Sequence, residues 1–391
     1  MECSDVRILD ETIEQLLEMK EKNLYLNQHP NRIWEGKDNK WRTYLGSGKD
    51  RRMVKRNTKQ DLENYICHYY RNMELNPTIA ELFDLWMDYK LETGEIRLGT
   101  RDRYRDDYNR FIKGTLFALT HVKAIDQDTL DIFIRQQISK GLTSKAFANL
   151  RTILQGMFKY AKRNHMTDLS ISEFFKDLDI SRKVFKPVVK DVETGVFHED
   201  EIDKMIRYLY ANPTVENLGL IFAFQTGVRR GELAAIKWSD ISDDVLHIQR
   251  QEIIYKSEIK GKQIHAVVEY TKTEAGNRYI YLPENSMSVL MMLRWRNRDG
   301  EYLIEKDGKR VNKSTFNNVI LKACDGAGIP RRSMHKIRRT YGTTLIDNNV
   351  EDSLIMSQMG HSCIDTTRKY YYYANKNDKH KREQINKSIK W

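Results

Sequence analysis

The 391-residue sequence contains few cysteines and no long apolar run. Cys3, Cys67, Cys324 and Cys363 are far apart and form no CxxC pair, so neither a zinc site nor a disulfide framework is expected. The longest apolar run, LGLIFAF at 218–224, is much shorter than the ~18 residues that cross a bilayer and predicts a buried helix. The first residues are partly acidic and lack the apolar stretch of a signal peptide. These features favour a protein of the reducing cytosol with no membrane partner.

Nucleotide and metal motifs are also missing. The sequence has no P-loop, no cluster of carboxylates suited to Mg²⁺, no internal repeat and no long low-complexity segment. We therefore expect no cofactor. In contrast, 66 Lys and Arg outnumber 55 Asp and Glu, which gives a net charge of +11. This basic excess favours a polyanionic partner, although a well-solvated charged surface is the alternative.

The first basic cluster lies near the N-terminus, after a short amphipathic helix predicted at 11–22. WRTYL at 41–45 and RRMVKR at 51–56 predict two strands around the loop GSGKD, and Thr58 is placed to cap a following helix. The prediction is a small sheet with one basic face, backed by a helix. Trp41 and Tyr44 could instead be half-buried strand residues. The candidate DNA contacts are Trp41, Arg42, Tyr44, Arg51, Arg52 and Lys55.

The next region, residues 77–182, has almost wholly helical periodicity. Thr78 is predicted to cap a first helix, Thr100 opens a second, apolar positions 130–138 mark a third, and Thr143 starts a fourth. The basic outer face of these four helices suits contact with the DNA backbone, and an ordinary helical bundle is the alternative. The candidate contacts on the fourth helix are Lys145, Arg151 and Lys159.

The periodicity breaks around KVFKPVVKDVET, which predicts a linker at 183–194. The remaining residues begin with helices, pass through strand-like DVLHIQRQEIIY and HAVVEYTKTEAGNRYIYLP, and return to helices. We therefore predict a multidomain, mainly α protein: a small β-sheet plus helix at 1–75, an all-α four-helix domain at 76–182, and a mixed α/β domain, mostly helical with a small antiparallel sheet, at 195–391.

Four short patterns follow one another in this last region. TGVRRGEL at 226–233 places an arginine at a turn between two helices, and YTKTEAGNRYIYL at 270–282 predicts a β-hairpin with a lysine near its turn. HKIRR at 335–339 puts a histidine and an arginine on one helix face. MGHSCIDTTRKY at 359–370 separates a histidine and a tyrosine by nine positions. Each pattern alone is weak, and their order gives them weight. The candidate catalytic residues are Arg229, Lys272, His335, Arg338, His361 and Tyr370.

The set resembles the tyrosine recombinases, which include the lambda-type integrases. TGVRRGEL is similar to the family's TGxRxxEL box, HKIRR to its HxxR box, MGHS…TTRKY to LGHxxxxTTxxY, and TKTEAGNR to the KTxxSxR segment. Arg339 and Met359 depart from the family's pattern: relatives often carry His at the first position and Leu at the second. The two N-terminal regions are also similar to the arm-binding and core-binding domains of integrases from conjugative transposons and prophages.

The resemblance implies a metal-independent reaction in which a tyrosine breaks DNA by forming a 3′-phosphotyrosyl bond. In this reading Tyr370 is the nucleophile, and the neighbouring Tyr371 and Tyr373 stay open as alternatives. Arg229 and Arg338 would clamp the phosphate oxygens because guanidinium groups match them bidentately and stay charged. His335 would accept the proton of the tyrosine, and Lys272 would act as the general acid. His361 would complete the cage around the phosphate, and Glu232 would orient neighbouring side chains.

The same resemblance implies the assembly. Four subunits would hold two duplexes at core-type and arm-type sites, pass through a Holliday junction, and exchange their C-terminal tails at 375–391. An excisionase and a DNA-bending host protein are possible further partners, in a bacterial cytoplasm and associated with the nucleoid. Two alternatives are a type IB topoisomerase-like enzyme and a catalytically dead DNA-binding regulator.

Overall fold

The structure is a computed structural model that describes residues 19–20, 22–46, 51–187, 195–257, 261–363, 382 and 386–387. The chain divides into two compact units between positions 188 and 189, inside the segment predicted as a linker. The proposed further division at 75/76 stays a prediction. Several predicted features lie outside the described residues: most of the helix at 11–22, most of the GSGKD loop, Tyr370 with its neighbouring tyrosines, and most of the tail.

The described part of the first unit begins with helical residues at 19–20 and 22–28, so the helix predicted at 11–22 ends later than predicted. A small antiparallel sheet of order β1-β2-β3 follows, as predicted. Its strands alternate, so Thr43, Leu45 and Val54 point to the buried side, where Leu45 and Val54 pack with Leu62 and Ile66 of helix α2. Thr58 caps that helix by accepting a hydrogen bond from the N–H of Asp61. The elements are β1 (Trp34–Glu35), β2 (Trp41–Leu45), β3 (Arg52–Arg56) and α2 (Lys59–Glu74).

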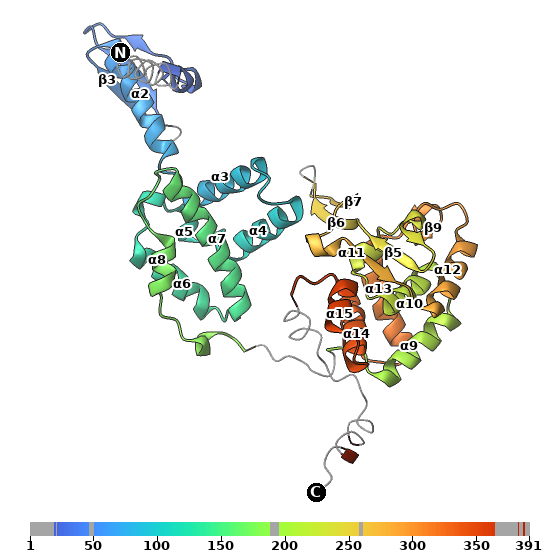
Figure 1. Cartoon of the computed structure of the whole chain (residues 1–391). Coiled ribbons are helices and arrows are strands. Elements are labelled where there is room, and N and C mark those ends of the chain that lie inside the picture. The colour runs from blue at the N-terminus through green and yellow to red at the C-terminus, as the bar shows by residue number, and fades with distance from the viewer. Residues whose placement is uncertain are drawn as a thin grey trace, which may run out of the picture. The chain divides into compact units, whose positions relative to one another are not determined.

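The four predicted helices of the next region are present and share one apolar core. The first begins with a capping box in which Thr78 and Glu81 satisfy each other's backbone N–H groups. Two short helices and two 3₁₀ turns complete this region (Figure 1). The elements are α3 (Ile79–Glu92), α4 (Leu98–Phe111), α5 (Leu116–Leu119), η2 (Val122–Ala124), α6 (Gln127–Ser139), α7 (Ser144–Arg163), α8 (Ile171–Asp177) and η3 (Arg182–Val184).

The start of the second predicted helix was wrong by two residues. Helix α4 begins at Leu98 with Arg97 as its N-cap, and does not open at Thr100. The carbonyl of Arg97 accepts hydrogen bonds from the N–H groups of Thr100 and Arg101, at 2.8 and 3.0 Å. Backbone bonds therefore close the first turn, and no side-chain cap is needed.

The second unit is built around α10, which contains the apolar run at 218–224 and is buried as predicted. Four helices pack against it: α9, α12, α13 and α14. Helix α15 packs against α14 (Figure 1). The helices are α9 (Glu199–Ala211), α10 (Val215–Thr226), α11 (Arg230–Leu233), α12 (Glu284–Arg296), α13 (Lys313–Gly326), α14 (Met334–Asp347) and α15 (Asp352–Met359).

Three small antiparallel sheets lie beside these helices. Strands β4, β5 and β8 form one sheet, β6 pairs with β7, and β9 pairs with β10. A 3₁₀ turn precedes the first sheet, at Trp238–Asp240 (η4). The strands are β4 (Ile241–Ser242), β5 (Val245–Ile248), β6 (Gln251–Lys256), β7 (Gln263–Val268), β8 (Arg278–Tyr281), β9 (Glu305–Lys306) and β10 (Lys309–Arg310).

The prediction of a β-hairpin at 270–282 was wrong. The hairpin in this part of the chain is β6–β7, and β8 pairs with β5 instead of with the segment that precedes it. Residues 270–277 form a loop that contains the 3₁₀ turn η5 (Glu274–Gly276). Hydrogen bonds within the loop take the place of hydrogen bonds between strands: the Thr271 hydroxyl and the Gly276 N–H both donate to the carbonyl of Thr273.

Within the part of the chain that the structure describes, no helix combines the length and the apolar character that crossing a membrane would need.

Candidate active site

The turn between α10 and α11 positions the first candidate arginine. Helix α10 ends at Gly227, whose φ of 62° lies in the left-handed region. A Cβ at this position would lie 2.3 Å from the ring of Tyr341, so the site needs glycine for space as well as for conformation. Two residues later, Arg229 is the N-cap of α11, and its N–H donates to Glu232 at 2.8 Å.

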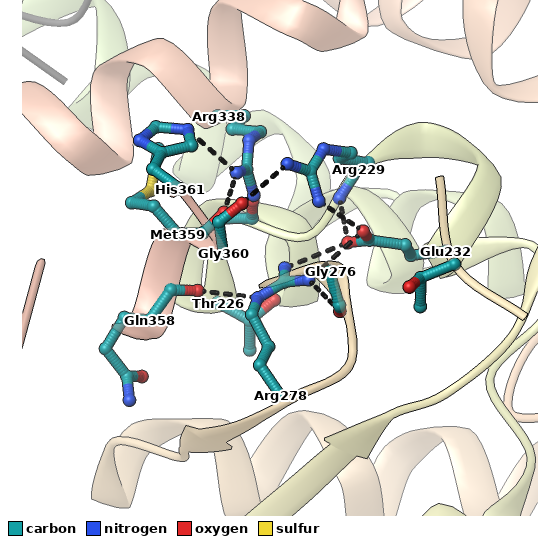
Figure 2. Close-up of polar contacts among 12 residues, drawn as sticks. Thr226, Arg229, Glu232, Gly276, Arg278, Arg338, Gln358, Met359, Gly360 and His361 are labelled. Carbon is teal, nitrogen blue, oxygen red and sulfur yellow. Dashed lines mark hydrogen bonds and ion pairs between the residues drawn. The ribbon is translucent and has the colours of Figure 1, made fainter. Parts of the chain in front are cut away.

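Glu232 is a buried carboxylate that joins two arginines. Its oxygens accept hydrogen bonds from the guanidiniums of Arg229, at 2.7 Å, and Arg278, at 2.9 and 3.1 Å (Figure 2). Burial alone would raise the pKa of Glu232, but the charge and hydrogen bonds of Arg278, together with the charges of Arg229 and Arg338, lower it to about 2. The carboxylate therefore stays ionised and fixes Arg229, which is the orienting role predicted for it.

Arg338 connects two turns of the chain from the buried side of α14. Its side chain is almost fully buried, and it donates hydrogen bonds to the carbonyls of Gly227, at 2.8 Å, and Met359. The same guanidinium lies 3.2 Å from Nε2 of His361 (Figure 2). Arg338 thus binds the end of α10 to the end of α15 and brings His361 into the site.

The turn after α15 is held by a second left-handed glycine. Gly360 has a φ of 59°, and a Cβ there would lie 2.6 Å from the carbonyl oxygen of Ala275. The carbonyl of Gly360 accepts a hydrogen bond from Arg229 at 3.1 Å. Burial, followed by the charges of Arg338 and Arg229, lowers the pKa of His361 to about 3. This imidazole is neutral at pH 7.

His335 lies one helical turn before Arg338, at the start of α14. Partial desolvation, together with the charges of Arg339 and Arg338, lowers its pKa to about 4. His335 lines a cleft of about 510 Å³ together with Arg229, Lys272 and Arg338. The site therefore combines permanent guanidinium charges with two neutral imidazoles that can accept a proton or a hydrogen bond.

Five of the six candidate catalytic residues are thus gathered in one region. Four line the cleft, and the fifth, His361, contacts it through Arg338. Lys272 reaches the cleft from the loop between β7 and β8 rather than from a hairpin turn. Tyr370, Tyr371 and Tyr373 lie outside the described residues, so the position of the nucleophile is still a prediction.

Sequence reasoning missed Arg278 and Gln358. Arg278 is 6 % exposed, and its Nε donates to the carbonyl of Gln358 at 2.8 Å. The side chain of Gln358 accepts a hydrogen bond from the N–H of Tyr281, which attaches α15 to strand β8. One signal could have identified Arg278: in RYIY, alternation places it on the same buried face as Ile280.

The candidate DNA contacts on the N-terminal sheet fall on two faces. The strand register places Arg42 opposite Lys55, and Tyr44 lies on that same outer face, with the Arg51 guanidinium 4.2 Å from the centre of its ring. Arg42 also forms an ion pair with Asp38 at 2.6 Å. Trp41 and Arg52 belong to the opposite face, where Trp41 packs against the small apolar core.

The candidate contacts on α7 share an exposed surface. Lys145, Arg151 and Lys159 are all exposed, whereas the opposite side of the helix is buried. The Arg151 guanidinium lies 4.9 Å from the centre of the Phe175 ring. This arrangement leaves the three charges available to a partner.

No group of three His, Cys, Asp or Glu side chains lies together as metal ligands would, among the residues that the structure describes.

The arginines, neutral histidines and lysine gathered at this cleft are groups that can bind a phosphate and exchange protons with it. In agreement, residues 196–378 match the phage integrase family. The matched segment belongs to this family, and the comparisons support an enzyme of the tyrosine recombinase type, which cuts and rejoins DNA in site-specific recombination.

The similarity to known proteins extends beyond the matched segment. The chain is 25 % identical over 320 residues to a "Tyrosine recombinase XerC-like" protein of Caldanaerobacter subterraneus, covering 76 % of this chain and 79 % of that one. It is 23 % identical over 290 residues to the ICEBs1 integrase of Bacillus subtilis, covering 70 % and 72 %. A structure of the Tn1549 transposon integrase with transposon right-end DNA shares the fold, with a TM-score of 0.58 at 17 % identity, covering 80 % and 99 %.

Proposed function

We propose that this enzyme integrates and excises a mobile DNA element, with Tyr370 as the nucleophile. The observation that carries the catalytic part is the cleft lined by Arg229, Lys272, His335 and Arg338. The mobile element is favoured by the similarity to the ICEBs1 and Tn1549 integrases. Double-stranded DNA is the substrate, and the enzyme acts in the bacterial cytoplasm, at the nucleoid.

The chemistry follows from the charges of the site. The phenol oxygen of Tyr370 attacks the scissile phosphorus as its proton passes to the neutral imidazole of His335. Arg229 and Arg338 bind the non-bridging oxygens, whose negative charge grows in the transition state. The bond from phosphorus to the 5′ oxygen breaks, and Lys272 donates a proton to that oxygen. The products are a 3′-phosphotyrosyl bond and a free 5′ hydroxyl.

Rejoining reverses these steps with a different hydroxyl. The 5′ hydroxyl of the partner strand attacks the phosphotyrosyl bond, and the phenol of Tyr370 leaves with its proton restored. Four subunits exchange one pair of strands to form a Holliday junction and then the second pair. The subunits bind core-type and arm-type DNA sites and exchange their tails at 375–391. An excisionase and a DNA-bending host protein assist them.

A suicide substrate tests the nucleophile. A duplex carrying the attachment junction and a nick beside the scissile phosphate traps the covalent adduct, because the short 5′ fragment diffuses away. Wild-type enzyme and Tyr371→Phe should form the adduct, whereas Tyr370→Phe should not. An adduct in Tyr370→Phe would move the assignment to another tyrosine, and peptide mapping of the adduct would identify Tyr371 or Tyr373.

The topoisomerase alternative is tested with supercoiled DNA that lacks an attachment site. A site-specific recombinase should leave most of this DNA supercoiled over a time in which it converts its own junction. Efficient relaxation without the junction would favour the alternative. The regulator alternative fails if the suicide substrate yields any Tyr370-dependent adduct.

A further inference from the structure

The catalytic cleft has polar lining residues that the reaction of one phosphate does not use. Helix α13 contributes Lys313 and Asn317, which are four residues apart and therefore share a face of the helix. Arg230 and Ser333 also line the cleft. These four side chains offer two charges, an amide and a hydroxyl, all of which can donate hydrogen bonds to an anion.

Lys313 is held in place by Glu252, a buried residue of strand β6. The side chain of Glu252 has no solvent exposure and accepts hydrogen bonds from the backbone N–H of Lys313, at 3.1 and 3.2 Å. The ammonium of Lys313 donates to the backbone carbonyl of Glu252 at 3.0 Å. An ammonium has three N–H donors, so this anchor leaves donors for a ligand in the cleft.

Glu252 is shared with other cationic groups. Its carboxylate also forms ion pairs with Arg310 and with Nδ1 of His265, the latter at 2.7 Å. Burial lowers the pKa of Lys313, Glu252 raises it, and the nearby charge of Arg230 lowers it. Glu252 is already paired with Arg310, so an anion in the cleft would balance the charges of Lys313 and Arg230.

We propose that Lys313, Arg230, Asn317 and Ser333 bind a second backbone phosphate of the cleaved strand, one that neighbours the scissile phosphate and does not react. This inference rests on the proposed function, since the catalytic residues at the same cleft receive the scissile phosphate. Lysine, amide and hydroxyl donors are common contacts to DNA phosphates. Holding the neighbouring phosphate fixes the scissile one in line with the tyrosine, which is a positioning effect on rate.

Phosphate neutralisation tests the proposal. Suicide substrates carry one uncharged methylphosphonate at each position flanking the scissile phosphate, and the rate of adduct formation is measured for wild type and Lys313→Met. In wild type, one flanking position should slow the reaction about 10- to 100-fold, as expected for one charge-assisted contact. Lys313→Met should be slow on the normal substrate and should lose no further rate at that position, because the two changes remove the same interaction.

Lys322→Met is the matched control, since Lys322 is exposed on the same helix and outside the cleft lining. It should keep the full sensitivity of wild type. The proposal is overturned if Lys313→Met remains as sensitive as wild type at every flanking position. If Lys313→Met unfolds, Asn317→Ala and Arg230→Gln are scanned in the same way. Failure of wild type to form any adduct on normal DNA would instead overturn the proposed function.

Discussion

The substitution Glu232→Gln removes one charge from the centre of the site and keeps its shape. Glu232 is 3 % exposed and joins the guanidiniums of Arg229 and Arg278. Its pKa falls from an ordinary 4.5 to about 2, so the native state favours the ionised form. At ~1.4 kcal/mol per pKa unit, this shift contributes about 3 kcal/mol to the free energy of unfolding at pH 7. Glu232→Gln should lose about this amount, within the range found when buried ion pairs are broken.

The sign of the pH dependence follows from the lowered pKa. The contribution is complete above pH 4.5, the ordinary pKa, and is lost as the pH falls towards 2, where native Glu232 takes up a proton. The difference between wild type and Glu232→Gln should therefore shrink to less than about half by pH 3. The full chain is unfolded in urea, and unfolding is monitored by hydrogen exchange of peptides from α10 and α14. This readout gives the free energy of unfolding of the second unit separately.

The matched control is Glu301→Gln. Glu301 is 64 % exposed and forms an ion pair with Lys237 at 2.8 Å on the surface of the same unit. Such a pair is worth at most about 1 kcal/mol, so this variant should stay close to wild type. Equal stability of the Glu232→Gln and Glu301→Gln variants at pH 7 would refute the reasoning.

Three further outcomes are expected. Gly227→Ala should lower the free energy of unfolding by about 2 kcal/mol or more, because of the positive φ and the Tyr341 ring, as thermal denaturation will show. Arg278→Met should destabilise the wild-type protein more than it destabilises Glu232→Gln. A double-mutant cycle of urea unfolding should give an interaction energy of about 1–3 kcal/mol between the two side chains. His335 and His361 should titrate below pH 5 in DNA-free protein and stabilise it less as the pH falls below 6.5, which NMR titration checks, with His335→Asn for assignment.

Local signals were enough to predict most elements of the fold. Thr58, Thr78 and Thr143 each cap the helix that was expected after them, because a side-chain oxygen at the N-cap satisfies a backbone N–H within the first turn. The apolar run in α10 is too continuous for an exposed helix and is buried. The small N-terminal sheet was predicted from the strand-like runs WRTYL and RRMVKR on either side of a loop with two glycines.

Errors came where pairing depends on residues far apart in the sequence. The segment at 270–282 has the composition of a hairpin, but its second strand pairs with β5, some 30 positions earlier. Sequence reasoning also cannot show that Glu232 contacts Arg278, since the pair is 46 positions apart. The cleft residues were found through motif spacing. Arg278, which holds them in place, is the last residue of the TKTEAGNR pattern but was given no role in that reasoning.

The two candidate catalytic arginines also have a structural role, and this affects how their variants must be interpreted. Arg338 donates to the carbonyls of Gly227 and Met359, and Arg229 donates to that of Gly360, so the two guanidiniums brace the turns at both left-handed glycines. An alanine at either arginine would release these turns as well as remove a phosphate contact. The loss of rate would then mix positioning with transition-state binding.

Lysine separates the two contributions at Arg338. A lysine keeps the charge but has no planar fork, so its ammonium cannot reach the carbonyls of Gly227 and Met359 in the same geometry and also bind phosphate bidentately. If bracing dominates, Arg338→Lys should unfold nearly as easily as Arg338→Ala. If phosphate binding dominates, Arg338→Lys should be the more stable variant yet form adduct slowly. Arg338 is 1 % exposed and links α14 to Gly227, which lies 111 positions earlier in the sequence. We therefore expect bracing of the turns to account for most of the stability loss.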